Sequence, residues 1–333
     1  MTLTPSEQQT PPLTVRFIAP ADGPAVRALF QAVFDQPMSE ALWHWKYQLG
    51  ENRCVGVFHD GELIAHYGTI GAAISYFGQP AKALQVVDVM VKPAYRRAAK
   101  KASSPFYRAG HYCAEHSVGY DRPFLLGYGF PSDRHMLLAQ HLDLYTPVGR
   151  MFEVFWPVSA PVPGAGWWHR VQRIDNRNFA ALRQPLMTLW QQLQQDLAGH
   201  IVVRKDADWL QRRYLAHPEQ RYTLHLQRQR FGGRPLGLIV LKEEAEQLQL
   251  MDYVGPLAHL PRLLQYALHC TYAAGKARLC TWCSEVFLPR FSCHGGEGQP
   301  LRITTPATTR QPGPLAAELQ DRWWLLPGDT DFL

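Results

Sequence analysis

The sequence predicts a mixed α/β fold that occurs twice in tandem. Two apolar stretches carry an aspartate at the same place, and they read LQVVDVMVKP at 84–93 and LQLMDYVGP at 248–256. In each half, a helix end, a strand, a glycine-containing turn and another strand precede this stretch, and a helix and a short apolar strand follow it. Hairpins pair strands antiparallel and helical crossovers pair them parallel, so we expect a mixed sheet in each half.

The elements of the first half can be predicted in chain order. A helix ends in LWHWKYQ, at Lys46 and Tyr47, and a hairpin follows in FHDGELIAHYG. Asp60-Gly61 suits the positive φ angles of a two-residue hairpin turn. After the strand at 84–93, the pattern indicates a helix in SSPFYRAGHYCAEHS, a strand in FLLGYGF and a helix in SDRHMLLAQHL.

The second half repeats this order. A helix ends at Arg213-Tyr214, two strands lead to the stretch at 248–256, and a helix leads to the strand-like ARLCTWCS. The turn-rich segment 295–314 is expected to be mobile, and the tryptophans of the closing DRWWLLPGDTDFL to anchor the C-terminus. Because PVSAPVPGAGWW at 157–168 resembles a linker, the predicted organisation is a flexible tail at 1–14 and two domains at 15–160 and 161–333.

Composition limits the classes of partner. The net charge of +6 is compatible with an anionic ligand but too small to indicate nucleic acid, and Trp43, Trp45 and Tyr47 have the spacing of core residues. No segment approaches the roughly 20 apolar residues that cross a bilayer, and the N-terminus lacks the pattern of a secretory signal. We therefore expect a cytoplasmic protein with neither nucleic acid nor membrane as a partner.

The six cysteines are interpreted as reduced thiols. Cys280 and Cys283 form a CxxC motif, and with Cys293 and His294 nearby a zinc site is conceivable. Small thiols in a strand are more often core residues, so no metal is expected.

A concentration of positive charge follows the strand at 84–93. No acidic residue occurs from Val89 to Cys113. A strand that enters a turn and then a helix presents backbone N–H groups and the positive helix end to an anion. This predicts a site for a ligand with several phosphates, near the basic residues Lys92, Arg96, Arg97, Lys100, Lys101 and Arg108.

These residues resemble the acetyl-CoA signature of the GNAT N-acetyltransferase superfamily. VKPAYRRAAKK after an apolar strand is similar to the family's strand end and pyrophosphate loop, and LWHWKYQ, DGELIAHYG and YGFPS occur in the family's order. The resemblance covers residues 15 to about 155, and the second half looks like a degenerate GNAT copy. It implies two tandem GNAT-like acyl-CoA N-acyltransferase domains.

The resemblance also implies how acetyl-CoA, as co-substrate, is bound. Main-chain groups of Met90 and Val91 would pair with the pantetheine arm. Arg96 stands at the first loop position, whereas Ala99 and Lys101 replace small residues that let the backbone approach phosphate. The implied phosphate-binding residues are Arg96, Arg97, Ala98, Ala99, Lys100 and Lys101.

Catalysis in such an enzyme needs a general base and an acid. Asp88 is the nearest strand carboxylate, although Asp252 at the matching place also favours a structural hydrogen bond. His66 and Tyr67 on the preceding strand are alternatives. The family's tyrosine is missing from SDRHMLLAQHL, so Tyr128, or Tyr145 beyond that helix, is the candidate acid.

Two functions follow from these observations. The first is an N-acetyltransferase that moves an acetyl group from acetyl-CoA to a primary amine of a small molecule, sugar or peptide by direct attack in a ternary complex. The alternative is a non-catalytic GNAT-like module that binds acyl-CoA or another protein, because both loop glycines and the usual tyrosine are absent.

Overall fold

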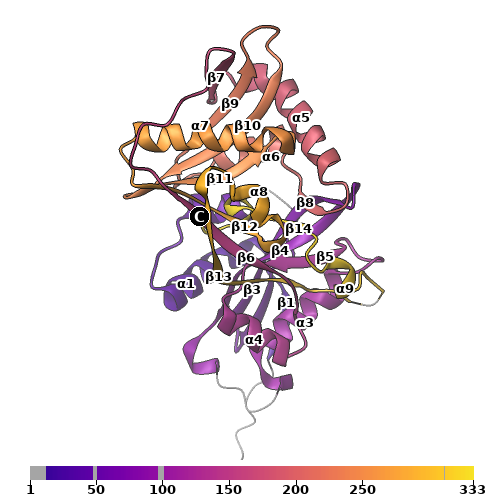
Figure 1. The fold of residues 1–333 in the computed structure, drawn as a ribbon. Coiled ribbons are helices and arrows are strands. Elements are labelled where there is room, and N and C mark those ends of the chain that lie inside the picture. Colours follow the sequence, from indigo (N-terminus) through magenta and orange to yellow (C-terminus); the bar gives the residue numbers. More distant parts are fainter. Residues whose placement is uncertain (1–12, 48–50, 97–100, 311) are drawn as a thin grey trace, which may run out of the picture.

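Two seven-stranded mixed sheets form the centre of the protein (Figure 1). The structure is a computed structural model that describes residues 13–47, 51–96, 101–310 and 312–333. Strands pair parallel in β4–β5, β8–β14 and β11–β12, and the other strand pairs are antiparallel. The predicted mixed α/β class is confirmed.

The first sheet has the order β1-β2-β3-β4-β5, with β8 on the far part of β3 and β14 beside β8. Its strands are β1 (Thr14–Phe17), β2 (Val55–His59), β3 (Glu62–Tyr76), β4 (Gln79–Val91), β5 (Leu126–Gly129), β8 (Ile201–Val203) and β14 (Trp323–Trp324). The helices of this half are η1 (Pro20–Asp22), α1 (Gly23–Phe34), α2 (Glu40–Tyr47), η2 (Pro93–Tyr95), η3 (Lys101–Ser103), α3 (Pro105–Ser117) and α4 (Asp133–His141).

The second sheet has the order β13-β6-β12-β11-β10-β9-β7. Its strands are β6 (Thr146–Pro157), β7 (His169–Ile174), β9 (Tyr222–Gln229), β10 (Pro235–Glu243), β11 (Gln247–Val254), β12 (Arg278–Ser284) and β13 (Glu297–Ala307). The helices are α5 (Phe179–Asp196), α6 (Ala207–Leu210), the π-helix η4 (Gln211–Leu215), η5 (Leu257–His259), α7 (Leu260–Ala273), η6 (Glu285–Phe287), α8 (Leu288–Phe291), η7 (Cys293–Gly295), α9 (Ala316–Leu319) and η8 (Pro327–Asp329).

The two sheets correspond strand by strand. The run β1-β2-β3-β4-β5 matches β7-β9-β10-β11-β12 in order, and the last pair is parallel in both. Each sheet also has a bulge at or next to its aspartate, at Asp88 in β4 and next to Asp252 in β11. The repeat seen in the sequence is therefore a repeat of structure.

The halves exchange strands. The first-half strand β6 pairs with β12 and β13 of the second sheet, whereas β8 and β14 of the second half extend the first sheet. Residue 160, the predicted domain boundary, lies in the connection between β6 and β7. Of the predicted tail at 1–14, residues 1–12 lie outside the described residues, and β1 begins at Thr14.

Two of the local structure predictions are confirmed and one is wrong. Asp60 and Gly61 have φ angles of 51° and 79° in the turn between β2 and β3, as the hairpin prediction requires. Trp323 and Trp324 are buried, so the prediction of an anchored C-terminus is confirmed. The expectation of a mobile segment at 295–314 is wrong for Glu297–Ala307, which pairs with β6 as the edge strand β13 and takes up Pro300 and Pro306 where the register shifts. Residue 311 of that segment lies outside the described residues.

Candidate active site

The bulge in β4 forces Asp88 into an unusual conformation. His66 pairs with Met90 and Gly68 with Val87, so two residues of β4 oppose one residue of β3. Asp88 has φ 42°, in the left-handed region that few residues other than glycine adopt. Such strain persists where surrounding contacts fix it, and it often marks a functional position.

Those contacts come from the end of α2. Lys46 Nζ lies 3.1 and 2.9 Å from the two carboxylate oxygens of Asp88, and Tyr47 donates its hydroxyl to Asp88 Oδ2 at 2.5 Å. Both side chains reach the strand because the helix ends over it. Gly68 permits this approach, since a side chain there would meet the Tyr47 hydroxyl.

A third residue reaches the same lysine from the C-terminal tail. Asp331 Oδ2 accepts a hydrogen bond from Lys46 Nζ at 2.7 Å, so one buried cation faces two buried carboxylates. Although burial opposes a charged lysine, Asp331 and Asp88 raise the pKa of Lys46. Burial raises the pKa of Asp331, and the nearby Asp88 raises it further while Lys46 opposes the shift. Asp331 is thus the carboxylate with an electrostatic reason to accept a proton.

A cavity opens where β4 and β5 separate. Their pairing ends at Val86–Gly129, and beyond it lies a cavity of about 490 Å³ between the two strands, which we call the β4–β5 cavity. Apolar and aromatic side chains dominate its wall, with a few polar groups: Phe30, Phe34, Gln36, Val86, Val87, Asp88, Val89, Phe106, Gly129, Phe130, Pro131, Ser132, His135, Tyr145, Pro306, Asp331 and Phe332. The described part of β4 beyond Val86 can therefore offer its edge to an extended ligand.

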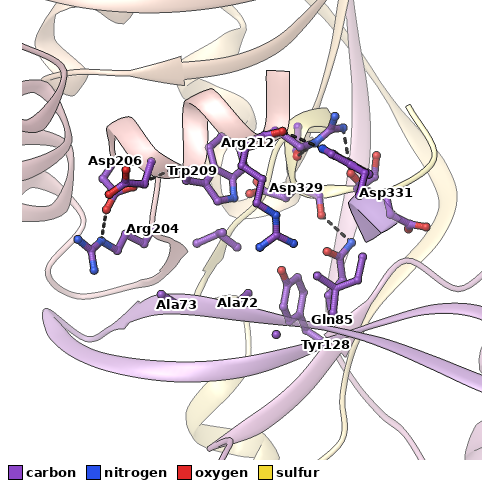
Figure 2. Close-up of a pocket in the computed structure, with 18 residues that line it drawn as sticks. Ala72, Ala73, Gln85, Tyr128, Arg204, Asp206, Trp209, Arg212, Asp329 and Asp331 are labelled. Atoms are coloured by element: carbon purple, nitrogen blue, oxygen red, sulfur yellow. Dashed lines mark hydrogen bonds and ion pairs between the residues drawn. The ribbon is translucent and has the colours of Figure 1, made fainter. Parts of the chain in front are cut away.

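A second cavity of about 320 Å³, the inter-sheet cavity, lies between β3 and the α6–η4 helices (Figure 2). Trp45, Gln85, Tyr128, Trp209 and Asp331 are among its lining residues. Figure 2 shows Arg212 extending from η4 toward Tyr128 and Gln85, across the space from Arg204 and Asp206. Asp331 lines both cavities, so the carboxylate stands where they meet.

The predicted catalytic residues occupy different places around this junction. Asp88 lines the β4–β5 cavity, whereas Tyr128 lines the inter-sheet cavity and stacks on Trp323. Burial raises the pKa of Tyr128, so its hydroxyl keeps its proton. His66 is buried, its Nδ1 lies 3.0 Å from the Asp88 carbonyl oxygen, and burial lowers its pKa. His66 thus contacts the strained backbone of the bulge and is not among the residues that line either cavity.

The predicted phosphate loop is described only at its edges. Arg97, Ala98, Ala99 and Lys100 lie outside the described residues. Arg96 is exposed and donates Nε–H to the Val91 carbonyl at 3.0 Å. The pKa of His135 is lowered mainly by burial, then by Arg134, and also by the positive charge of Arg96. Since His135 lines the β4–β5 cavity, Arg96 stands near its rim.

The remaining residues predicted to bind the cofactor, Lys101, Met90 and Val91, have different surroundings. Lys101 pairs with Asp143 at 2.6 Å and lies 4.9 Å from the ring centre of Tyr107, at the start of the turn into α3. Met90 is buried and packs toward α1, so any contact with a ligand there would be made by its main chain. Val91 is half-buried at the end of β4.

The second copy contains an equivalent cluster of a lysine, a tyrosine and two aspartates, but the tail of the chain packs against it. Tyr214 donates its hydroxyl to Asp252 at 2.5 Å, and Lys205 contacts Asp252 at 2.6 Å and Asp329 at 2.7 Å. η8 packs against β11 and β12, and the N–H of Leu325 bonds to Ser284 at the end of β12. The chain's own tail therefore fills the place in the second copy that is open between β4 and β5 in the first.

The sequence indicated some of these residues and missed others. The Lys-Tyr helix end and the ending GDTDF were visible, but neither was assigned a role. The signal that could have identified Asp331 is the pair of aspartates two residues apart, one for each repeated centre. Their partners, Lys46 and Lys205, lie far away in the sequence.

The two cysteines of the CxxC motif do not point toward a common site. Cys280 and Cys283 are three residues apart in β12, so their side chains point to opposite faces of the strand, and both are buried. Within the described ranges, no three histidine, cysteine or acidic side chains form a cluster that could hold a metal ion. In the same ranges, no helix is both long and apolar enough to span a bilayer.

Part of the sequence and the fold are similar to those of acetyltransferases of the GNAT type. Residues 14–104 match the acetyltransferase (GNAT) domain, which confirms the predicted resemblance. No curated protein shows significant similarity to the sequence.

Solved structures extend the likeness to nearly the whole chain. A probable N-acyltransferase of unknown function from Enterococcus faecalis is 13% identical, with TM-score 0.65 over 93% of this chain and 74% of that one. A GCN5-related N-acetyltransferase from Kribbella flavida is 14% identical, with TM-score 0.61 over 90% and 71%. N-myristoyltransferase from Saccharomyces cerevisiae with bound myristoyl-CoA is 10% identical, with TM-score 0.55 over 91% and 85%. At these identities the shared property is the fold.

Proposed function

We propose that this protein transfers an acyl group from acyl-CoA to an amine, with the first copy as the catalytic domain. The observation that carries the proposal is the position of Asp331 at the junction of two cavities, beside the strained bulge of β4. One cavity suits a thioester and the other an acceptor, and a proton acceptor lies between them.

The acyl-CoA would enter the β4–β5 cavity. The cavity lies where the two parallel strands separate, so the β4 edge from Val87 to Val91 can pair with the amides of a pantetheine arm as an added strand would. Arg96 near the rim offers positive charge for phosphate. The wall is apolar enough for acyl groups longer than acetyl, and acetyl-CoA is the first donor to test.

The acceptor would approach from the inter-sheet cavity. Asp331 takes a proton from the ammonium or from the attacking nitrogen, the nitrogen forms a bond to the thioester carbonyl carbon, and the carbon–sulfur bond breaks. The leaving thiolate then gains a proton from solvent, because burial raises the pKa of Tyr128 and makes its hydroxyl a weaker acid. Asp88 holds Lys46 and Tyr47, so we assign it a positioning role beside the base.

Binding and turnover test the proposal in sequence. Isothermal titration should detect acetyl-CoA binding in the wild type, and Arg96→Glu should weaken it, whereas the matched charge reversal Arg122→Glu, at an exposed position outside both cavities, should not. Thiol release with a panel of primary amines should then report transfer. Absence of binding would refute the proposal, and binding without transfer to any amine would favour the non-catalytic alternative.

A further inference from the structure

An exposed aromatic cluster stands at the end of the second sheet. Trp167, Trp168 and Phe231 have exposed fractions of 62%, 65% and 60%, and their ring centres lie 4.9 to 6.2 Å apart. They occupy the loop before β7 and the turn between β9 and β10, which Figure 1 shows at the end of the molecule away from α4. Large side chains in mutual contact and open to water form an apolar surface that normally meets a partner.

The two loops are held in place. The N–H of Arg230 bonds to the carbonyl of Trp168 at 2.9 Å, which ties the turn to the loop. Gly166, Gly232 and Gly233 have positive φ angles of 72°, 75° and 65°, so the loops turn sharply and project the rings. We call these three rings and the basic residues around them the aromatic tip.

The surroundings of the aromatic tip are positive. Three segments at this end of the molecule, 157–174, 220–242 and 253–284, contain no aspartate or glutamate. Their basic residues include Arg170, Arg228, Arg230, Arg234 and Arg262, with His169 and His259. Asp196, whose carboxylate accepts the N–H of Leu257, partly offsets the lowering of the pKa of His259 by burial and neighbouring cations.

Several of these charges face one another. Arg170 and Arg228 are direct cross-strand partners in β7 and β9, an arrangement that is destabilising for like charges. Arg170 accordingly helps burial to lower the pKa of Arg228. Arg262 makes a hydrogen-bond contact with the imidazole of His169. Within the described chain, Nε and Nη2 of Arg228 have no hydrogen-bond partner. An external anion would relieve this repulsion.

We propose that the aromatic tip docks on a membrane surface that contains anionic lipids. Tryptophan and phenylalanine insert at the headgroup level, and arginine attracts anionic headgroups, so the combination fits an interface better than either feature alone. Single-stranded nucleic acid is disfavoured because the three rings pack on each other instead of standing apart as platforms for successive bases. This differs from the sequence-based expectation of no membrane partner.

Vesicle binding tests this proposal with the full chain. The wild type should co-sediment with vesicles of phosphatidylcholine and phosphatidylserine, less with phosphatidylcholine alone, and less as salt rises. The double variant Trp167→Ala/Trp168→Ala should bind about tenfold more weakly. Each of Arg230→Gln and Arg234→Gln should cost about fivefold on the anionic vesicles.

The matched control is Tyr120→Ala, which removes an aromatic side chain of 62% exposure from the other half of the molecule and should bind as the wild type does. Brominated lipid should quench the tryptophan fluorescence of the wild type more than that of the double variant. The proposal is overturned if anionic vesicles fail to bind the wild type at low salt, or if the double variant and Tyr120→Ala bind equally. Loss of single-stranded oligonucleotide binding in the double variant, without vesicle binding in the wild type, would overturn it in favour of nucleic acid.

Discussion

Asp331→Asn separates catalysis from stability most clearly. A general base supplies about 10²–10⁴ in rate, which corresponds to about 3–5 kcal/mol of transition-state stabilisation. We therefore expect kcat to fall by at least about 10² while acyl-CoA binding is retained. The acidic limb of the pH–rate profile, which reports the raised pKa of this carboxyl, should also disappear.

The structure limits the cost of this change to stability. Breaking a buried ion pair costs about 3–5 kcal/mol when it leaves a charge without a partner. Lys46 keeps Asp88 at 2.9 Å after the substitution, and one of two like charges is removed, so we expect a loss of only about 1–2 kcal/mol. Urea unfolding of the variant and the wild type measures this difference.

The matched control for the same chemical change is Asp321→Asn, at an exposed position in the same C-terminal segment and outside both cavities. It should keep wild-type kcat. If Asp331→Asn also keeps wild-type kcat with a primary amine as acceptor and an unchanged pH profile, Asp331 is not the base and the reasoning fails.

Three further variants probe the two lysine centres. Lys46→Met leaves two buried carboxylates without their cation and should destabilise the fold by about 3–5 kcal/mol in urea unfolding, and a loss below about 1 kcal/mol would contradict the network. Gly328→Ala places a Cβ against Tyr214 and Asp252, so it should shift the tail and lower both thermal stability and kcat; unchanged kcat would show that the tail does not fix Asp331. Burial raises the pKa of Asp329 to about 6, so its contribution to stability is present below its unfolded pKa near 4 and is lost as pH rises through 6. The unfolding free energy of the wild type minus that of Asp329→Asn should hence fall between pH 4 and pH 7 by up to about 3 kcal/mol, and a flat difference would argue against the shifted pKa.

Local patterns predicted most of the fold. The hairpin at Asp60-Gly61, the strands around Asp88 and Asp252 and the helix end at Tyr47 depend on neighbours in the sequence, and each was foreseen. Strand β13 was missed because its two prolines, its glycine and the two glycines just before it suggest a loop, and only pairing with β6 keeps it extended. Exchange of strands between the halves leaves no local signal, since it depends on which edges are open after each sheet has formed.

The site was less predictable than the fold. Asp88 was identified because a carboxylate in an apolar strand is unusual, but its strained φ angle and its ties to Lys46 and Tyr47 arise from the bulge and from packing. Asp331 enters the site from the far end of the chain, 285 residues beyond Lys46. No local pattern in the sequence predicts that two residues so far apart in the chain come into contact.

The two copies of the fold differ in what lies between their parallel strands. In the second copy the tail passes between β11 and β12, and Lys205, which also contacts Asp252, holds the buried Asp329 there. Two residues later the same tail presents Asp331 to the first copy, whose equivalent strands remain apart and bound a cavity. Filling one cleft therefore fixes the residue that completes the other, because the short segment between the aspartates leaves little freedom for Asp331 to move independently. On this reasoning, the second copy can lose its own substrate site and still be required for the reaction in the first.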